Sequence, residues 1–132
     1  MKKIIYLLVA TVFLLCGCAQ TTQTEHPKHS DLEKFSYLQE SAEYHDGRPG
    51  VRSSGFVNTE SIEINNVDQV VELANKECSV MYNTVTVAFD PDQKIYRVYF
   101  SPNGESAPLT LGGDLSVYIN EKGITQLIVA GE

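Results

Sequence analysis

The sequence predicts an α+β domain in which one main helix packs on a four-stranded antiparallel meander sheet, with a short extra helix before it. Apolar residues recur at helical spacing between positions 67 and 78, and they alternate with polar residues at strand spacing from position 84 onward. Turn-forming residues separate four strand-like runs. Consecutive strands joined by short turns usually pair, so a meander is expected, with the helix across one face.

The chain begins with the pattern of a secretory signal peptide. Lys2 and Lys3 precede an uncharged apolar stretch from Ile4 to Leu15, and small residues follow. A helix needs about 20 apolar residues to cross a bilayer, and this stretch has roughly a dozen. We therefore expect a cleaved leader, residues 1–17, rather than a permanent membrane span.

The leader ends in Leu15-Cys16-Gly17-Cys18, which resembles the lipobox of bacterial lipoproteins. In that motif an aliphatic residue, a tolerant position and a small residue precede the lipidated cysteine. The resemblance implies cleavage before Cys18 and a diacylglycerol thioether on it, because lipidation of Cys16 would place Leu15 where a small residue is needed. Two acyl chains anchor a protein stably, whereas one binds only marginally. The alternative is that Cys18 is an ordinary residue beside a conventional cleavage site.

Charge and cysteine content restrict the possible partners. Loss of Lys2 and Lys3 leaves eight basic side chains against seventeen acidic ones, so the formal charge changes from −7 to −9. An acidic surface repels polyanions, which excludes nucleic acid as an expected partner. Once Cys16 is removed and Cys18 is acylated, Cys78 is the remaining thiol. Its helical neighbours are apolar, so it is predicted to be a small buried hydrophobe.

Residues 18–29 are predicted to form a tether. From Ala19 to His29 no apolar residue larger than Ala appears, so the segment has no side chains with which to build a core. At about 5–6 Å times the square root of its length, such a tether holds the following residues roughly 20 Å from the lipid.

Residues 30–55 are predicted to form a short helix and a loop. Ser30 and Glu33 have capping-box spacing, and apolar residues follow at helical steps, which predicts a helix from Asp31 to Tyr44. Whether this helix docks on the main domain or forms only transiently is left open. Turn formers from Asp46 to Gly55 then predict a loop.

The main domain is predicted to span residues 56–132 and to begin with its most regular helix. Asn66 and Gln69 have the spacing of an N-terminal cap. The apolar face of this helix comprises Val67, Val70, Val71, Ala74 and Cys78.

Four strands follow the main helix. Asp90-Pro91-Asp92 predicts the first turn, residues 102–113 a loop, and Glu121-Lys122-Gly123 a tight hairpin. The predicted strands are Thr84 to Phe89, Lys94 to Ser101, Asp114 to Asn120 and Ile124 to Val129.

From Val67 to Val129 this order is similar to small extracytoplasmic domains of the PepSY and cystatin-like type. The helix, strand, Asp-containing turn and aromatic strand lead to a final hairpin that begins at Gly113. The same ending, Gly112-Gly113 followed by strand, turn and strand, also resembles nuclear-transport-factor-fold immunity proteins of bacteria. The resemblance implies a fold, and no functional residue is carried over from it.

No motif for catalysis, a cofactor or a metal is found. His26, His29 and His45 lie before the main domain and are predicted to be solvated, because no rigid element positions them. A calcium site of carboxylates around Glu60, Glu63, Asp90 and Asp92 is conceivable, but their spacing does not match a known calcium loop. A charged turn is the favoured interpretation.

The candidate binding residues are Arg97, Tyr99 and Tyr118. If Tyr96, Val98 and Phe100 face the helix, then Ile95, Arg97 and Tyr99 project from the opposite face of the sheet, and Tyr118 joins them from the next strand. Tyr and Arg are enriched at binding hot spots. Two alternatives stay open, namely an ordinary solvated sheet face, or a face covered by the predicted helix from Asp31 to Tyr44.

These observations predict an extracytoplasmic lipoprotein, held at the cell membrane, or at an outer membrane if one exists, by the lipid on Cys18. The favoured activity is non-catalytic binding of a protein or peptide, as in an inhibitor or immunity protein. The alternatives are a metal-dependent accessory protein or enzyme that uses surface carboxylates, and a passive structural component of the envelope.

Overall fold

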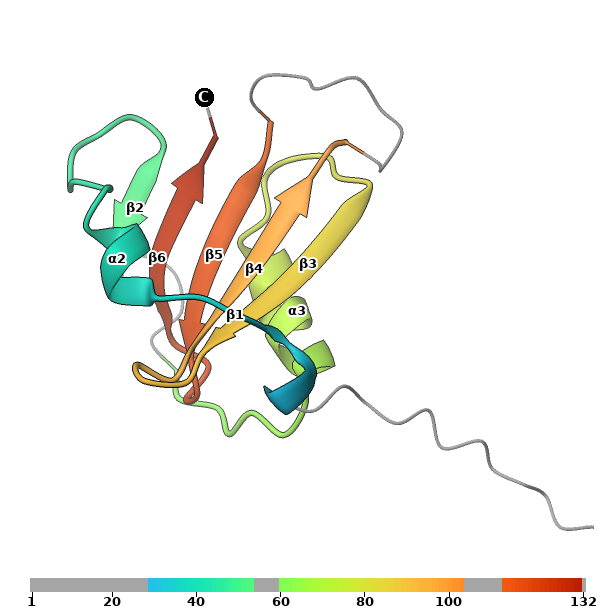
Figure 1. Ribbon diagram of the computed structural model, residues 1–132. Coiled ribbons are helices and arrows are strands. Elements are labelled where there is room, and N and C mark those ends of the chain that lie inside the picture. Colours follow the sequence, from blue (N-terminus) through green and yellow to red (C-terminus); the bar gives the residue numbers. More distant parts are fainter. Residues whose placement is uncertain (1–28, 54–59, 104–112, 132) are drawn as a thin grey trace, which may run out of the picture.

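The computed structural model describes residues 29–53, 60–103 and 113–131 (Figure 1). The predicted signal peptide, Cys18 and most of the predicted tether lie outside the described residues, as does the start of the predicted main domain near Phe56.

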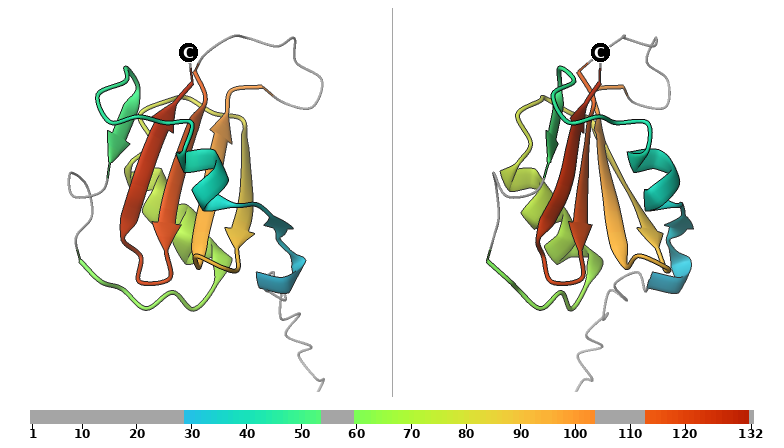
Figure 2. Two further views of the ribbon diagram at one scale, coloured as in Figure 1. Left: turned by 60° about the vertical axis from the view of Figure 1, so that its left-hand side comes forward. Right: turned by 90° about the vertical axis from the view of Figure 1, so that its left-hand side faces the viewer.

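The described residues form one six-stranded sheet with helices on both faces, which confirms the α+β class (Figure 2). The elements in chain order are η2 (His29–Asp31), β1 (Glu33–Lys34), α2 (Tyr37–Ser41), β2 (Val51–Ser53), α3 (Val67–Lys76), β3 (Thr84–Asp90), β4 (Ile95–Ser101), β5 (Leu115–Asn120) and β6 (Thr125–Ala130). The strand order across the sheet is β1-β3-β4-β5-β6-β2. β1 runs parallel to β3, and all other neighbours are antiparallel.

The four predicted strands form the central meander, β3 to β6, as expected from their alternation and turns. The prediction of a four-stranded sheet is nevertheless wrong. The segment predicted as helix and loop supplies one short strand to each edge, β1 beside β3 and β2 beside β6. These strands have two and three residues, too few to show an alternating pattern in the sequence.

Helix α3 begins and packs largely as predicted. The side chain of Asn66 accepts a hydrogen bond from the N–H of Gln69 at 3.0 Å, and Gln69 Oε1 accepts one from the N–H of Asn65 at 2.7 Å. The first bond satisfies a donor that a helix N-terminus otherwise leaves unpaired, and the second ties the residue before the cap to the first turn of the helix. The buried face is Val67, Val70, Leu73 and Ala74, so Leu73 joins the predicted set and Val71 lies only partly buried.

The helix predicted from Asp31 to Tyr44 is confirmed only over the five residues Tyr37–Ser41 and is wrong before and after them. Ser30 donates to Asp31 instead of capping a helix, and the N-cap is Ser36, whose hydroxyl accepts from the N–H of Gln39 at 3.4 Å. A helix of this length is marginal in isolation. Pairing of Glu33 and Lys34 with β3 therefore prevails over local helix propensity.

Each face of the sheet has its own apolar layer. Tyr96, Val98 and Phe100 face α3, as predicted, and lie in the larger core together with buried residues of that helix. On the opposite face a smaller core is formed by Ile95, Tyr118, Leu127 and Val129. Residues before α3 in the sequence pack on this smaller core, namely Phe35, Tyr37, Tyr44 and Val51.

In the turn between β3 and β4, Lys94 has a strained backbone conformation. Lys94 has a φ of 54°, which for a side-chain-bearing residue costs about 1–2 kcal/mol, while Gly loses about 0.5–1 kcal/mol more backbone entropy on folding. Its ammonium lies 3.5 Å from Glu121 in a mostly exposed ion pair, which contributes little. We expect Lys94→Gly to unfold in urea with a free energy about 0.5–1 kcal/mol higher than Lys94→Ala, which loses the same ion pair but keeps the strain. Equal stabilities for the two variants would contradict this prediction.

Candidate functional site

The site is built where residues 29–44, here called the strap, pass the β3 edge and cover the face of the sheet opposite α3 (Figures 1 and 2). Leu32 packs against the larger core, whereas Phe35, Tyr37 and Tyr44 pack against the smaller one. The strap therefore contacts both apolar layers, although none of the residues in α2 itself is buried.

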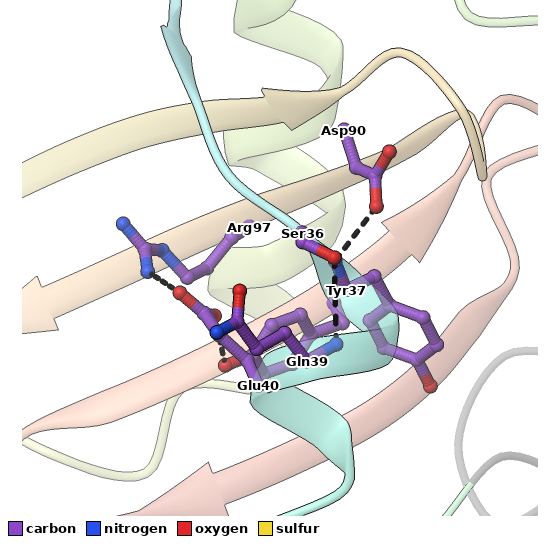
Figure 3. A network of polar contacts seen from close by, with 7 residues as sticks. Ser36, Tyr37, Gln39, Glu40, Asp90 and Arg97 are labelled. Atoms are coloured by element: carbon purple, nitrogen blue, oxygen red, sulfur yellow. Dashed lines mark hydrogen bonds and ion pairs between the residues drawn. The ribbon is translucent and has the colours of Figure 1, made fainter.

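Asp90, at the end of β3, fixes the position of the strap. One carboxylate oxygen accepts hydrogen bonds from the N–H groups of Asp92 at 2.8 Å and Gln93 at 3.0 Å, which closes the turn to β4. The other oxygen accepts from the N–H of Tyr37 at 2.7 Å, where α2 begins (Figure 3). Burial alone raises the pKa of Asp90, but the three backbone donors outweigh burial and hold its pKa below the ordinary value.

Glu40 of α2 is the second contact between the strap and the sheet. Its carboxylate forms an ion pair with Arg97 on β4 (Figure 3). It also accepts a hydrogen bond from the hydroxyl of Tyr118 on β5 at 3.0 Å. The guanidinium of Arg97 also lies 5.1 Å from the centre of the Phe35 ring. Burial, and then the Glu40 carboxylate, raise the pKa of Tyr118, so its hydroxyl stays a donor at neutral pH.

A groove lies between the segment from α2 to β2 and the strands β4 to β6. It consists of two adjoining hollows of about 490 and about 230 Å³. The larger is lined by Glu40, Glu43, Tyr44, Arg97, Tyr99, Asp114, Ser116 and Tyr118. The smaller shares Tyr44, Asp114 and Ser116 and adds Arg48, Pro49, Val51, Val129, Ala130 and Gly131. The larger hollow is within the range of ligand-binding pockets, about 300–1,000 Å³.

Asp114 lies where the two hollows meet. Burial first, and then the neighbouring Asp114 carboxylate, raise the pKa of Tyr99, so the Tyr99 hydroxyl is a neutral donor in the groove. The N–H of Gly131 donates to the carbonyl of Asp114 at 2.9 Å. A Cβ at position 131 would lie 1.6 Å from Asp114 Oδ1, so only glycine fits there without moving the carboxylate. The shape of the groove at this point thus depends on Gly131.

The three predicted binding residues are brought together, but they are not equally accessible. Arg97 and Tyr99 are partly buried residues of the groove wall. Tyr118 is only 1% exposed and lies beneath the strap, so a ligand reaches it only through its hydroxyl or after α2 moves. Of the interpretations left open by the sequence, the structure matches the one in which the segment around Leu32 to Ala42 covers this face.

Sequence reasoning missed most of the groove residues. Among these are Glu40, Glu43, Tyr44, Arg48, Asp114 and Ser116. The amphipathic pattern of the predicted helix was the available signal for the strap residues among them. When such a segment packs on a sheet through its apolar side, its polar side chains lie at the border of the contact. Its docking position is set by contacts distant in sequence, which periodicity does not reveal.

His29 and His45 are both exposed, as predicted, but His29 also contacts the sheet. The Tyr96 hydroxyl hydrogen-bonds with Nε2 of His29, whose ring centre lies 4.8 Å from that of Phe89. Burial, and then the charge of Glu121, raise the pKa of Tyr96 to about 12. His45 is exposed, and His26 lies outside the described residues.

The carboxylates considered for calcium do not come together. Within the described ranges no group of three or more His, Cys, Asp or Glu side chains is placed to hold a metal ion. Both oxygens of Asp90 accept backbone N–H groups, which gives it a structural role. Cys78 is partly buried against the larger core, and its thiol donates to the carbonyl of Val80 at 3.4 Å.

Comparison with known proteins gives no relative for this chain: no family model, no curated protein and no solved structure matches it. None of the helices in the described part of the chain is long and apolar enough to cross a membrane.

We expect Asp90→Asn to lower the free energy of unfolding by about 1–3 kcal/mol, because the amide NH₂ does not accept the hydrogen bonds that one carboxylate oxygen accepts. The pKa of Asp90 is depressed in the folded state, so its contribution is complete above the unfolded pKa of about 3.9 and is lost as the pH falls through the folded pKa. Urea unfolding from pH 7 to pH 2 should show the wild type and the variant converging below about pH 4.

Asp92→Asn is the matched control, because Asp92 is an exposed carboxylate in the same turn. It should change stability by no more than about 0.5 kcal/mol. A difference between wild type and Asp90→Asn that is the same at all pH values would contradict the prediction.

Proposed function

We propose that the protein is an extracytoplasmic lipoprotein, anchored through Cys18, that binds a protein or peptide in the groove beside the strap. The signal-peptide pattern and the lipobox-like Leu15-Cys16-Gly17-Cys18 support the address. The groove supports the activity. Binding of this kind needs no catalytic machinery, in keeping with an inhibitor or immunity protein.

The observation that carries the binding proposal is that aromatic and charged side chains from separate elements meet in one concave surface. Tyr44 and Tyr99 offer contact area with hydroxyl groups, while Arg97 and Asp114 offer charges of both signs. Tyr and Arg are among the residues enriched at hot spots. Glu40 and Arg97 are already paired, so a ligand meets a preorganised surface rather than an isolated charge.

The rigidity of the wall also supports a role in recognition. Arg97, Tyr99 and Ser116 are on central strands of the sheet, whose neighbours pair on both sides. Side chains on such strands keep their positions with little conformational freedom. The opposite wall is the strap, which is held mainly by side-chain and backbone contacts to Asp90, Arg97 and Tyr118 and so adapts more readily.

The anchor is tested by metabolic labelling with palmitate in a bacterial host, followed by detergent phase partitioning. Cys18→Ala should lose the lipid label and move to the aqueous phase, because two acyl chains provide the anchoring. Cys16→Ala is the matched control and should keep both the label and the partitioning. Loss of label with Cys16→Ala, or its retention with Cys18→Ala, would show that the assignment of the lipidated cysteine is wrong.

The groove is tested by replacing Tyr99 with a photoreactive phenylalanine analogue and irradiating cells of the native organism. The control is the same replacement at Tyr82, which is 38% exposed and does not line the groove. We expect a discrete adduct from position 99 that is missing from position 82. The adduct partner, once purified, should bind Arg97→Ala at least about thirtyfold more weakly than wild type, as for a hot spot of about 2 kcal/mol.

Two outcomes would refute the groove as the binding site. One is an identical adduct pattern from positions 99 and 82, which indicates random collision. The other is an unchanged affinity for Arg97→Ala, with folding of the variant verified by circular dichroism.

A further inference from the structure

In the part of the chain that the structure describes, the outer edge of β3 is open over most of its length. β1 pairs only with Ala88 and Phe89 at the end of the strand. Within the described residues, no strand lies beside the outer side of β3 from Thr84 to Val87 (Figure 1). An open edge presents unpaired backbone N–H and C=O groups, which form hydrogen bonds with any strand that approaches.

The stretch of β3 that β1 leaves uncovered also lacks the charges that usually protect such strands, whereas β1 itself consists of Glu33 and Lys34. From Cys78 to Phe89 the sequence contains no Asp, Glu, Lys or Arg, although the chain as a whole carries a net charge of −7. Met81, just before the strand, is 93% exposed. The other edge of the sheet is different, because β2 has only three residues and the middle one is Arg52. Edge strands are normally kept apart by short length and by charge.

We propose that two copies of this chain pair through their β3 edges, antiparallel, about a two-fold axis that passes beside Val85. An antiparallel pair has this axis normal to the sheet, so residues facing each other point to the same side. With the axis at Val85, residues 83–87 of one copy pair with residues 83–87 of the other. Ala88 of each copy stays paired with β1 of the same copy. This proposal is independent of the groove, since no residue of β3 lines it.

The side chains of β3 are self-complementary in this register. Thr84 of one copy lies opposite Thr86 of the other, twice, and Val85 lies opposite its own copy. Thr–Thr pairs and pairs of β-branched residues stabilise antiparallel strands. A second copy of the chain fits this edge because β3 carries no charge from Thr84 to Phe89. Two acidic chains repel one another over most of their surfaces, so an uncharged strand is where they can meet.

The test uses the full chain in a non-ionic detergent, studied by density-matched sedimentation equilibrium. The wild type should dimerise at concentrations below about 1 mM, and more tightly as salt is added, because salt screens the repulsion between acidic copies. Thr84→Lys with Thr86→Lys places like charges opposite each other in both pairs and should weaken the dimer at least tenfold.

The matched control is Thr84→Glu with Thr86→Lys, which places opposite charges across the interface in the same register. It should dimerise at least as well as wild type, and circular dichroism should show the same fold for all three chains. The proposal is overturned if the wild type stays monomeric up to about 1 mM. It is overturned equally if the double-lysine variant dimerises like wild type, or if the Glu/Lys variant is as monomeric as the double-lysine one.

Discussion

The hydrogen bond from the N–H of Tyr37 to the buried carboxylate of Asp90 is the contact on which the second layer of this domain depends. Asp90 is 2% exposed, and the same carboxylate closes the turn between β3 and β4. A buried charge without partners is expensive, so the carboxylate needs these donors. The carboxylate therefore joins the β3–β4 hairpin to the first residue of α2. This contact sets the direction in which the strap crosses the sheet.

Because α2 starts at this point, the side chain of Glu40 lies next to two polar side chains of the sheet, Arg97 and Tyr118. Arg97 and Tyr118 project from the face of the sheet that the strap covers, and Glu40 supplies a carboxylate to both. Helix propensity contributes little here, because five residues are too few to be helical on their own. Leu38 of the same helix is 60% exposed, so α2 is held on the sheet by packing of Tyr37 on the smaller core together with the polar contacts of Glu40.

The sequence was sufficient for the elements whose pattern is local. The alternation in β3 to β6 and the cap at Asn66 identify the meander, the main helix and the faces that Arg97 and Tyr99 occupy. The strap was not predictable in the same way. Its decisive contacts join residues 53, 57 and 78 positions apart, and its strands are too short to show a period. The groove residues that the strap contributes were missed for the same reason.

The two proposed surfaces are compatible with one another because of the symmetry of strand pairing. A two-fold axis normal to the sheet joins two six-stranded sheets edge to edge and keeps α3 of both copies on one side. The grooves, formed by the strap and the strands β4 to β6, then lie together on the opposite side. The proposed dimer would therefore present two grooves in the same direction. A partner with two copies of the recognised segment would bind both grooves at once. Its second segment would bind at a high effective concentration, so the overall affinity would rise without any additional interaction within either groove.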